Sequence, residues 1–122
     1  MYLLDTSVLI DLLRKREPAV AWFKTVAVDP RVSVISLTEL WVGIKRQKEE
    51  ADVLQLESAL RALPIDREIA LRAGVLLRHY AASHSLEVPD AIIAATAEHH
   101  GLRLATLNTK HFPMFPKLKP AY

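Results

Sequence analysis

The chain has 122 residues, 51% of them hydrophobic and none of them cysteine. This excludes a disordered chain and any disulfide or thiolate metal site, and the length suits one domain over residues 1–122. The 16 lysines and arginines outnumber the 14 acids by only two, so net charge alone does not argue for a nucleic-acid partner.

In the first half of the chain, short apolar runs typical of strands alternate with segments whose apolar residues have helical spacing. Asp29-Pro30 is a typical turn and separates two such strand–helix groups. The predicted elements are a strand over 2–4, helices over about 7–15 and 18–27, a strand over 32–35, and helices over about 37–48 and 51–62.

The second half continues the alternation. Asp66 suits a helix N-cap, Gly101 is a typical helix stop, and Pro64 suits an edge strand. The predicted elements are a strand over 63–65, helices over about 67–84 and 89–100, a strand over 103–106, and a proline-containing tail of turns with at most one edge strand. Strands alternating with helices predict a three-layer α/β domain with a parallel sheet.

Three carboxylates stand close behind short apolar runs or at the start of an apolar helix. Asp5 follows residues 1–4, Glu39 follows the second predicted strand by a short link, and Asp90 opens the helix after Pro89. In a parallel sheet such positions converge on one crevice, where carboxylates repel one another unless a cation joins them. The pattern therefore predicts a divalent metal site with open water positions, suited to phosphate chemistry.

Each acid also has a purely structural explanation. Asp5 could cap a helix, Glu39 completes a capping-box pattern that starts at Ser36, and Asp90 in a first helical turn favours the helix dipole. Caps need not share one sheet edge, however, and the helix over 91–97 is apolar on all faces. A carboxylate at the mouth of a buried helix is costly to ionise without a partner, which favours the metal site.

Four segments resemble, in this order, the successive motifs of PIN-domain proteins, and in particular of VapC-type toxins from bacterial and archaeal toxin–antitoxin pairs. They are Leu3–Ile10, Ser36–Leu40, Pro89–Ala97 and Leu104–Asn108. The similarity extends from Met1 to about Pro120. It implies a three-layer α/β/α PIN-like domain with a mainly parallel central sheet of four to five strands.

The resemblance also implies an activity. It is that of a Mg²⁺-dependent endoribonuclease, with Mn²⁺ able to replace Mg²⁺, which cleaves RNA phosphodiester bonds and is held inactive by a cognate antitoxin. Asp5 and Asp90 would be direct metal ligands, and Glu39 would bind through water or position the attacking water. Thr6 or Ser7 could hydrogen-bond a carboxylate or the phosphate, or simply begin the helix.

A homodimer is implied as well, formed by the early helices together with a groove for the antitoxin. Apolar residues at helical spacing could serve there: Leu9, Leu12, Leu13, Trp41 and Ile44.

The chain departs from the family at the fourth acidic position. Asn108 is the fourth candidate catalytic residue and can orient water or metal without adding charge, while His111 stands where some members carry Asp. Either residue could fill the position. This departure motivates a second hypothesis, a degenerate PIN domain that binds RNA or a protein partner without cleavage.

The remaining features are less specific. Basic clusters at 14–16, 45–48 and 110–119 are either solvated helix ends or a track for RNA phosphates. The other histidines lack metal-ligand spacing, and a phosphohydrolase for small substrates would want a second Asp or a Lys near Asp5. With no apolar run near about 18 residues and no signal-peptide pattern, we expect a cytoplasmic protein without membrane association.

Overall fold

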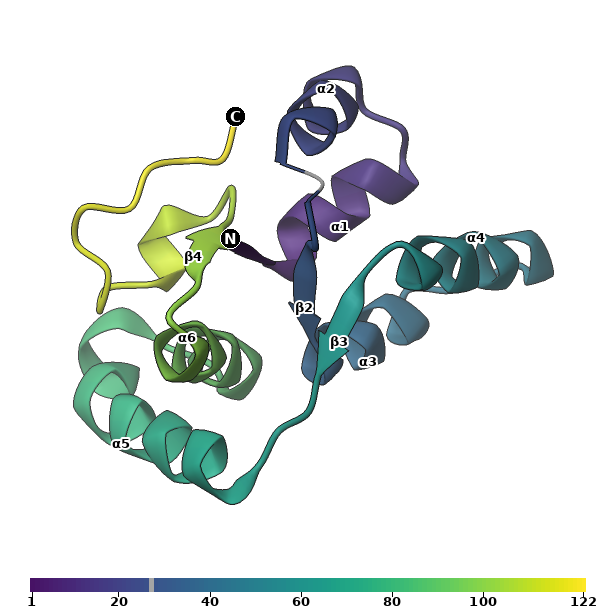
Figure 1. Cartoon of the computed structure of the whole chain (residues 1–122). Coiled ribbons are helices and arrows are strands. Elements are labelled where there is room, and N and C mark those ends of the chain that lie inside the picture. The colour runs from purple at the N-terminus through teal and green to yellow at the C-terminus, as the bar shows by residue number, and fades with distance from the viewer. Residues whose placement is uncertain (27) are drawn as a thin grey trace.

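The computed structural model describes residues 1–26 and 28–122, and its four strands form one sheet in the order β3-β2-β1-β4 (Figure 1). The elements are β1 (Tyr2–Leu4), α1 (Thr6–Leu13), α2 (Glu17–Val26), β2 (Arg31–Ser33), α3 (Val34–Val42), α4 (Gln47–Ser58), β3 (Arg61–Leu63), α5 (Arg67–His84), α6 (Val88–His100), β4 (Arg103–Ala105) and a 3₁₀ turn η1 (Thr109–His111).

All neighbouring strands run parallel, with Leu3 of β1 level with Arg31 of β2 and with Leu104 of β4. Because every strand runs the same way, all four end at one edge of the sheet, and the segment after each strand begins there. The central strand β1 is flanked by β2 and by β4, so the first and last strands of the chain are neighbours.

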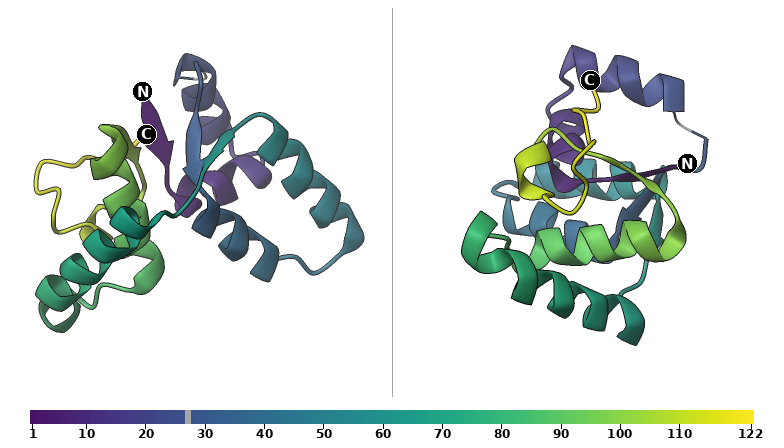
Figure 2. Two further views of the ribbon diagram at one scale, coloured as in Figure 1. Left: turned by 60° about the horizontal axis from the view of Figure 1, so that its bottom comes forward. Right: turned by 90° about the vertical axis from the view of Figure 1, so that its left-hand side faces the viewer.

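Helices cover both faces of the sheet, as the left view of Figure 2 shows. Successive strand residues point to opposite faces. Leu3 and Leu104 therefore pack in the core beneath α5 and α6, whereas Leu4 and Ala105 pack in a second core beneath α1 and its neighbours. The predicted three-layer α/β/α architecture with a parallel sheet is confirmed, with four strands.

The two long C-terminal helices form where the sequence predicts them. The Asp66 carboxylate accepts a hydrogen bond from the Ile69 amide at the start of α5 (2.9 Å), and α6 ends at Gly101 in the left-handed region (φ 62°). Its middle from Ala91 to Ala97 is almost wholly buried, as a helix apolar on all faces requires.

Several predicted boundaries were wrong. The second strand ends at Ser33 rather than residue 35, because the Ser33 hydroxyl caps α3 by accepting from the Ile35 amide (3.2 Å). The capping box at Ser36 therefore does not exist, and Ser36 lies inside α3. Helix α3 also ends six residues before the predicted 48, α4 is displaced to Gln47–Ser58, and β3 to Arg61–Leu63, directly before Pro64.

The tail after β4 forms the turn η1 and no edge strand within the described residues. Two hydrogen bonds hold the end of this tail. The Ala121 amide donates to the Thr106 carbonyl (3.0 Å), and the Tyr122 hydroxyl donates to Asp11 on α1 (2.7 Å). Burial and this hydrogen bond raise the pKa of the Tyr122 phenol well above its usual range. Among the described helices, none is long and apolar enough to cross a membrane.

Candidate functional site

The three predicted carboxylates lie around the edge of the sheet where the strands end. Asp5 is the first residue after the central strand β1, Asp90 lies in the first turn of α6, and Glu39 projects from α3. Thr6, the residue after Asp5, donates its hydroxyl to Glu39 Oε1 (2.7 Å), which brings Glu39 against the start of α1. The fold thus brings residues 5, 39 and 90 to one region.

Asp5 is 4% exposed, and its carboxylate is held by two hydroxyl groups. Ser7 Oγ and Thr106 Oγ1 both donate to Asp5 Oδ2, at 2.8 and 2.7 Å. Although Asp5 occupies the N-cap position of α1, its side chain caps no amide there. Helix capping therefore does not explain this acid, and because both hydroxyls bind Oδ2, Oδ1 is left for another partner.

Glu39 is positioned in the same manner by α1. Thr6 Oγ1, which donates to Glu39, also lies 2.9 Å from Ser36 Oγ one turn earlier on α3. Thr6 is the donor to both oxygens, and because a hydroxyl has one proton, Ser36 Oγ and Glu39 Oε1 share it. Glu39 is half-buried and faces α1 instead of its own helix start, which removes the capping-box explanation for this acid as well.

Asp90 is the acid whose charge is least favourable. Burial, followed by the neighbouring charge of Asp5, raises the pKa of the Asp90 carboxyl to about 6, and Glu39 adds to this while His111 opposes it. Its side chain is 20% exposed, and Asp90 Oδ2 lies 3.5 Å from His111 Nδ1. The raised pKa is the electrostatic sign of acids crowded together in a partly dry site.

The donor set fits a hard divalent cation, because carboxylate oxygens are the ligands that Mg²⁺ takes in proteins. Asp90 interacts electrostatically with both Asp5 and Glu39, yet no three acid or imidazole side chains of residues 1–26 and 28–122 close around a single point. The acids are therefore near enough to repel one another, a repulsion that a cation would relieve, without forming a finished coordination cage.

Two hydroxyl residues of this site escaped the sequence analysis, and one predicted residue lies at its margin. Thr106 follows β4 just as Asp5 follows the adjacent β1, but an uncharged threonine after a strand gives no signal until the two strands are known to be neighbours. Ser36 was assigned to a cap. Asn108 is exposed, and its backbone amide donates to Thr106 Oγ1 (3.0 Å), with no side-chain hydrogen bond to an acid in the described chain.

A groove of about 540 Å³ adjoins the site at Glu39. It runs between α1, α3 and α4, and its lining combines apolar, basic and acidic residues. Leu13 and Ile44, two of the residues predicted for a partner groove, line it, whereas Leu9 is fully buried in the core and Trp41 is exposed on α3. The basic lining residues are Arg14, Lys45, Arg46 and Lys48.

Comparison with known proteins places this geometry in context. Residues 2–117 match the PIN domain family. The protein named Ribonuclease VapC10 of Mycobacterium tuberculosis is 42% identical over all of this chain and 93% of its own length, and Ribonuclease VapC19 of the same species is 36% identical over the whole of both. A chain in the solved toxin–antitoxin complex from Klebsiella pneumoniae is 34% identical, with a TM-score of 0.85 over 100% of this chain and 98% of that one.

Proposed function

The chain belongs to the PIN domain family, and from this premise we propose that it is a metal-dependent endoribonuclease that acts as the toxin of a toxin–antitoxin pair. Similarity along its full length to proteins named ribonuclease VapC supports the activity. Similarity to a chain of a toxin–antitoxin complex supports the partner. An RNA substrate is consistent with the basic residues that line the groove beside Glu39. A cytoplasmic location is part of the same proposal.

The observation that carries the proposal is the electrostatic coupling of three acids at the sheet edge. A structural carboxylate would be paired or solvated, but Asp90 is partly buried beside Asp5 and Glu39, and its pKa is raised to about 6. A divalent cation bound there would lower the pKa of Asp90 again, since it favours the ionised form of every acid around it.

Asp5 and Asp90 would hold Mg²⁺, or Mn²⁺ in its place, and Glu39 would position the attacking water. When bound, the ion supplies charge neutralisation at the scissile phosphate and acidifies a coordinated water. The chain's own contribution is positioning. Ser7 and Thr106 fix the Asp5 carboxylate through Oδ2, and Thr6 fixes Glu39 through Oε1.

The antitoxin would bind along the groove beside Glu39. Its apolar walls suit an extended or helical tail, and a cationic tip such as Arg could pair with the acids in place of the metal. We further propose a homodimer, since Trp41 and Val42 on α3 are large apolar residues left exposed at 42% and 82%.

The primary test is Mg²⁺-dependent cleavage of RNA by the purified protein. Asp5→Asn and Asp90→Asn should each reduce cleavage at least 100-fold, as expected when a group acting in the transition state is lost. Glu50→Gln, an exposed acid on α4, is the matched control and should cleave like the wild type. Undiminished cleavage by folded Asp90→Asn protein would contradict the site.

The alternative, binding without cleavage, is favoured by one feature, namely Asn108 and His111 in place of a fourth acid. Expression in a bacterial host separates the two hypotheses. A ribonuclease toxin arrests growth, and co-expression of the antitoxin restores it. Normal growth despite abundant folded protein would favour the non-cleaving alternative, and a monomeric mass in light scattering at micromolar concentration would contradict the homodimer.

A further inference from the structure

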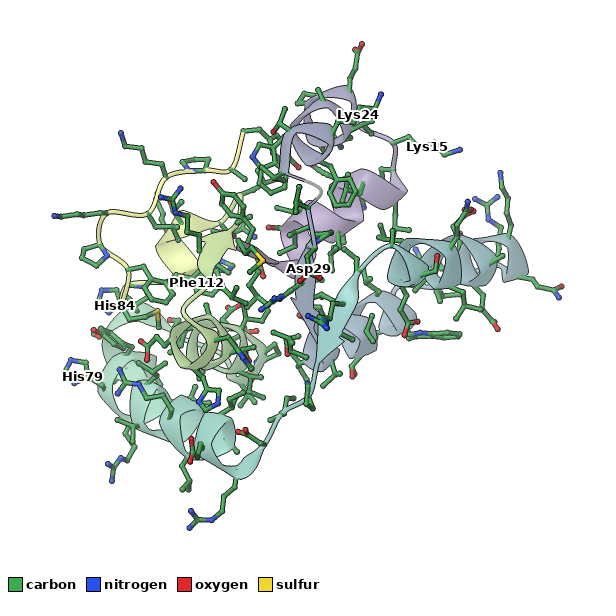
Figure 3. The ribbon with its side chains drawn as sticks, viewed as in Figure 1. Lys15, Lys24, Asp29, His79, His84 and Phe112 are labelled. Atoms are coloured by element: carbon green, nitrogen blue, oxygen red, sulfur yellow. The ribbon has the colours of Figure 1, made fainter. Side chains whose placement is uncertain are left out.

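Of the two candidates for the fourth position, His111 is the one whose side chain contacts an acid of the site, Asp90. His111 Nδ1 lies 3.5 Å from Asp90 Oδ2, whereas among residues 1–26 and 28–122 Asn108 contacts the site through its backbone amide, which donates to Thr106 Oγ1. The neighbouring Phe112 is fully buried in the core beneath α5 and α6, and Figure 3 shows it between η1 and α6. This anchor fixes the end of η1, so His111 is presented beside Asp90 by the fold.

The spacing suits two ligands of one ion. Two atoms bound at right angles to an ion at about 2.1 Å stand about 3 Å apart, close to the 3.5 Å between the imidazole nitrogen and the carboxylate oxygen. The His111 side chain is 56% exposed, so a small rotation meets no core packing.

An ion pair is the simpler explanation for this contact, but it is a weak one. At 3.5 Å, with the imidazole more than half exposed, the pair would be screened by water and worth little. An ion pair alone would also give Asp90 and His111 no shared function. If both bind one metal ion, the His111 nitrogen that faces Asp90 is a ligand.

We propose that His111 supplies a nitrogen ligand to the metal site, so that the site prefers a divalent transition ion such as Mn²⁺ or Co²⁺ over Mg²⁺. The inference rests on the proposed metal-dependent function. Mg²⁺ takes oxygen ligands and binds imidazole poorly, whereas affinity for nitrogen rises along the first-row series from Mn²⁺ through Co²⁺. Replacing an acid by a neutral imidazole also removes one negative charge, which weakens binding of Mg²⁺ most.

Pulsed electron paramagnetic resonance of the Mn²⁺-loaded protein tests the ligand directly. The wild type should show hyperfine coupling to a ¹⁴N nucleus, and His111→Ala and His111→Asp should not. His79→Ala is the matched control, since His79 is exposed on the outer side of α5, away from the site (Figure 3), and should keep the coupling.

Titration calorimetry with Co²⁺ and with Mg²⁺ tests the preference. His111→Asp should lower the ratio of Co²⁺ to Mg²⁺ affinity by about tenfold or more, since even residues that only hydrogen-bond to a metal ligand change metal affinity about 10- to 100-fold. An unchanged ratio, or no ¹⁴N coupling in a wild type that binds Mn²⁺ and cleaves RNA, would overturn the inference while leaving the function. Coupling without any RNA cleavage would support His111 and contradict the function, and no binding of any of these ions would overturn both.

Discussion

Hydroxyl groups hold two acids of this site, Asp5 and Glu39, in place. The Thr106 hydroxyl is fully buried, donates to Asp5 Oδ2 and accepts from the Asn108 amide. It thereby connects the end of β4 to the end of β1 and sets the start of the segment that leads to His111.

Thr106→Val should keep the side-chain shape but leave the Asn108 amide and Asp5 Oδ2 each short of one hydrogen bond. Such a loss costs about 1–3 kcal/mol, and metal affinity should fall by about tenfold because Asp5, the proposed ligand, is no longer oriented. Thr25→Val is the control, since the Thr25 hydroxyl donates to the Trp22 carbonyl at an exposed site. Urea unfolding and calorimetry measure both effects. Equal losses of stability in the two variants would show that the buried network is unimportant.

Asp90 should make stability depend on pH. Its folded-state pKa of about 6 exceeds the ordinary 3.8, so the folded protein binds this proton more tightly than the unfolded chain does. The free energy of unfolding should therefore fall as pH rises from about 4 to about 6, and the loss should persist above.

Asp90→Asn mimics the protonated acid and should remove that loss. With EDTA present, the variant should be more stable than the wild type by roughly 1–2 kcal/mol at pH 7.5, allowing for solvent screening, and about equal at pH 4. Thermal unfolding across this range provides the measurement. A variant less stable than the wild type at pH 7.5 would mean that the ionised carboxylate is well paired in the protein.

The sequence pointed to the acids because charge is conspicuous beside apolar runs, and it could not reveal how they are held. A threonine after a strand, such as Thr106, is too common to single out until β1 and β4 are known to be neighbours. The choice between Asn108 and His111 likewise depended on the turn η1, whose three residues carry no periodic pattern.

Among the elements, α5, β1 and β4 were predicted closely, whereas β2, β3, α3 and α4 were displaced by two to six residues at one end or both. Helix α5 was predicted to the residue, since 18 residues offer several repeats of the helical spacing and Asp66 caps the first turn. Each strand has three residues, too few to show alternation. The run Val32–Ile35 suits a strand by propensity, yet the Ser33 cap starts α3 within it, so a local hydrogen bond decided the boundary.

Two glycines should respond to alanine in opposite directions. Gly101 ends α6 at φ 62°, where a side chain is strained, so Gly101→Ala should destabilise the protein by about 1 kcal/mol. Gly74 lies inside α5 with no atom within 4 Å of an added Cβ, so Gly74→Ala should stabilise it by about 0.5–1 kcal/mol. Denaturant titration of both variants tests the pair, and shifts of the same sign would contradict the role of Gly101.

At the scale of the whole molecule, basic side chains lie beside the acidic site. Both Glu39 and the basic residues line the groove between α1, α3 and α4. Lys45 and Lys48 line it near Glu39, which turns two separate clusters of the sequence, 14–16 and 45–48, into parts of one surface. This placement supports a phosphate track over the alternative of unrelated helix ends.

Removing both groove lysines should weaken RNA binding in a salt-dependent manner. In an Asp90→Asn background that cannot cleave, Lys45→Ala with Lys48→Ala should reduce the slope of log affinity against log salt by about 1.4, or 0.7 per lost phosphate contact to a single strand. Lys24→Ala on α2, outside the groove, is the control (Figure 3). Fluorescence anisotropy at several salt concentrations gives the slopes, and identical slopes for all proteins would exclude the track.

The pairing of β1 with β4 has a consequence for protein synthesis. Asp5 leaves the ribosome early, but the hydroxyl of Thr106 that holds its carboxylate lies 101 residues later in the chain. A nascent polypeptide interrupted before β4 has an unpaired edge on its central strand and lacks part of the core around Leu104. Interrupted translation should therefore yield misfolded fragments that cellular proteases degrade, and the assembled site should exist only in chains that have been translated past β4.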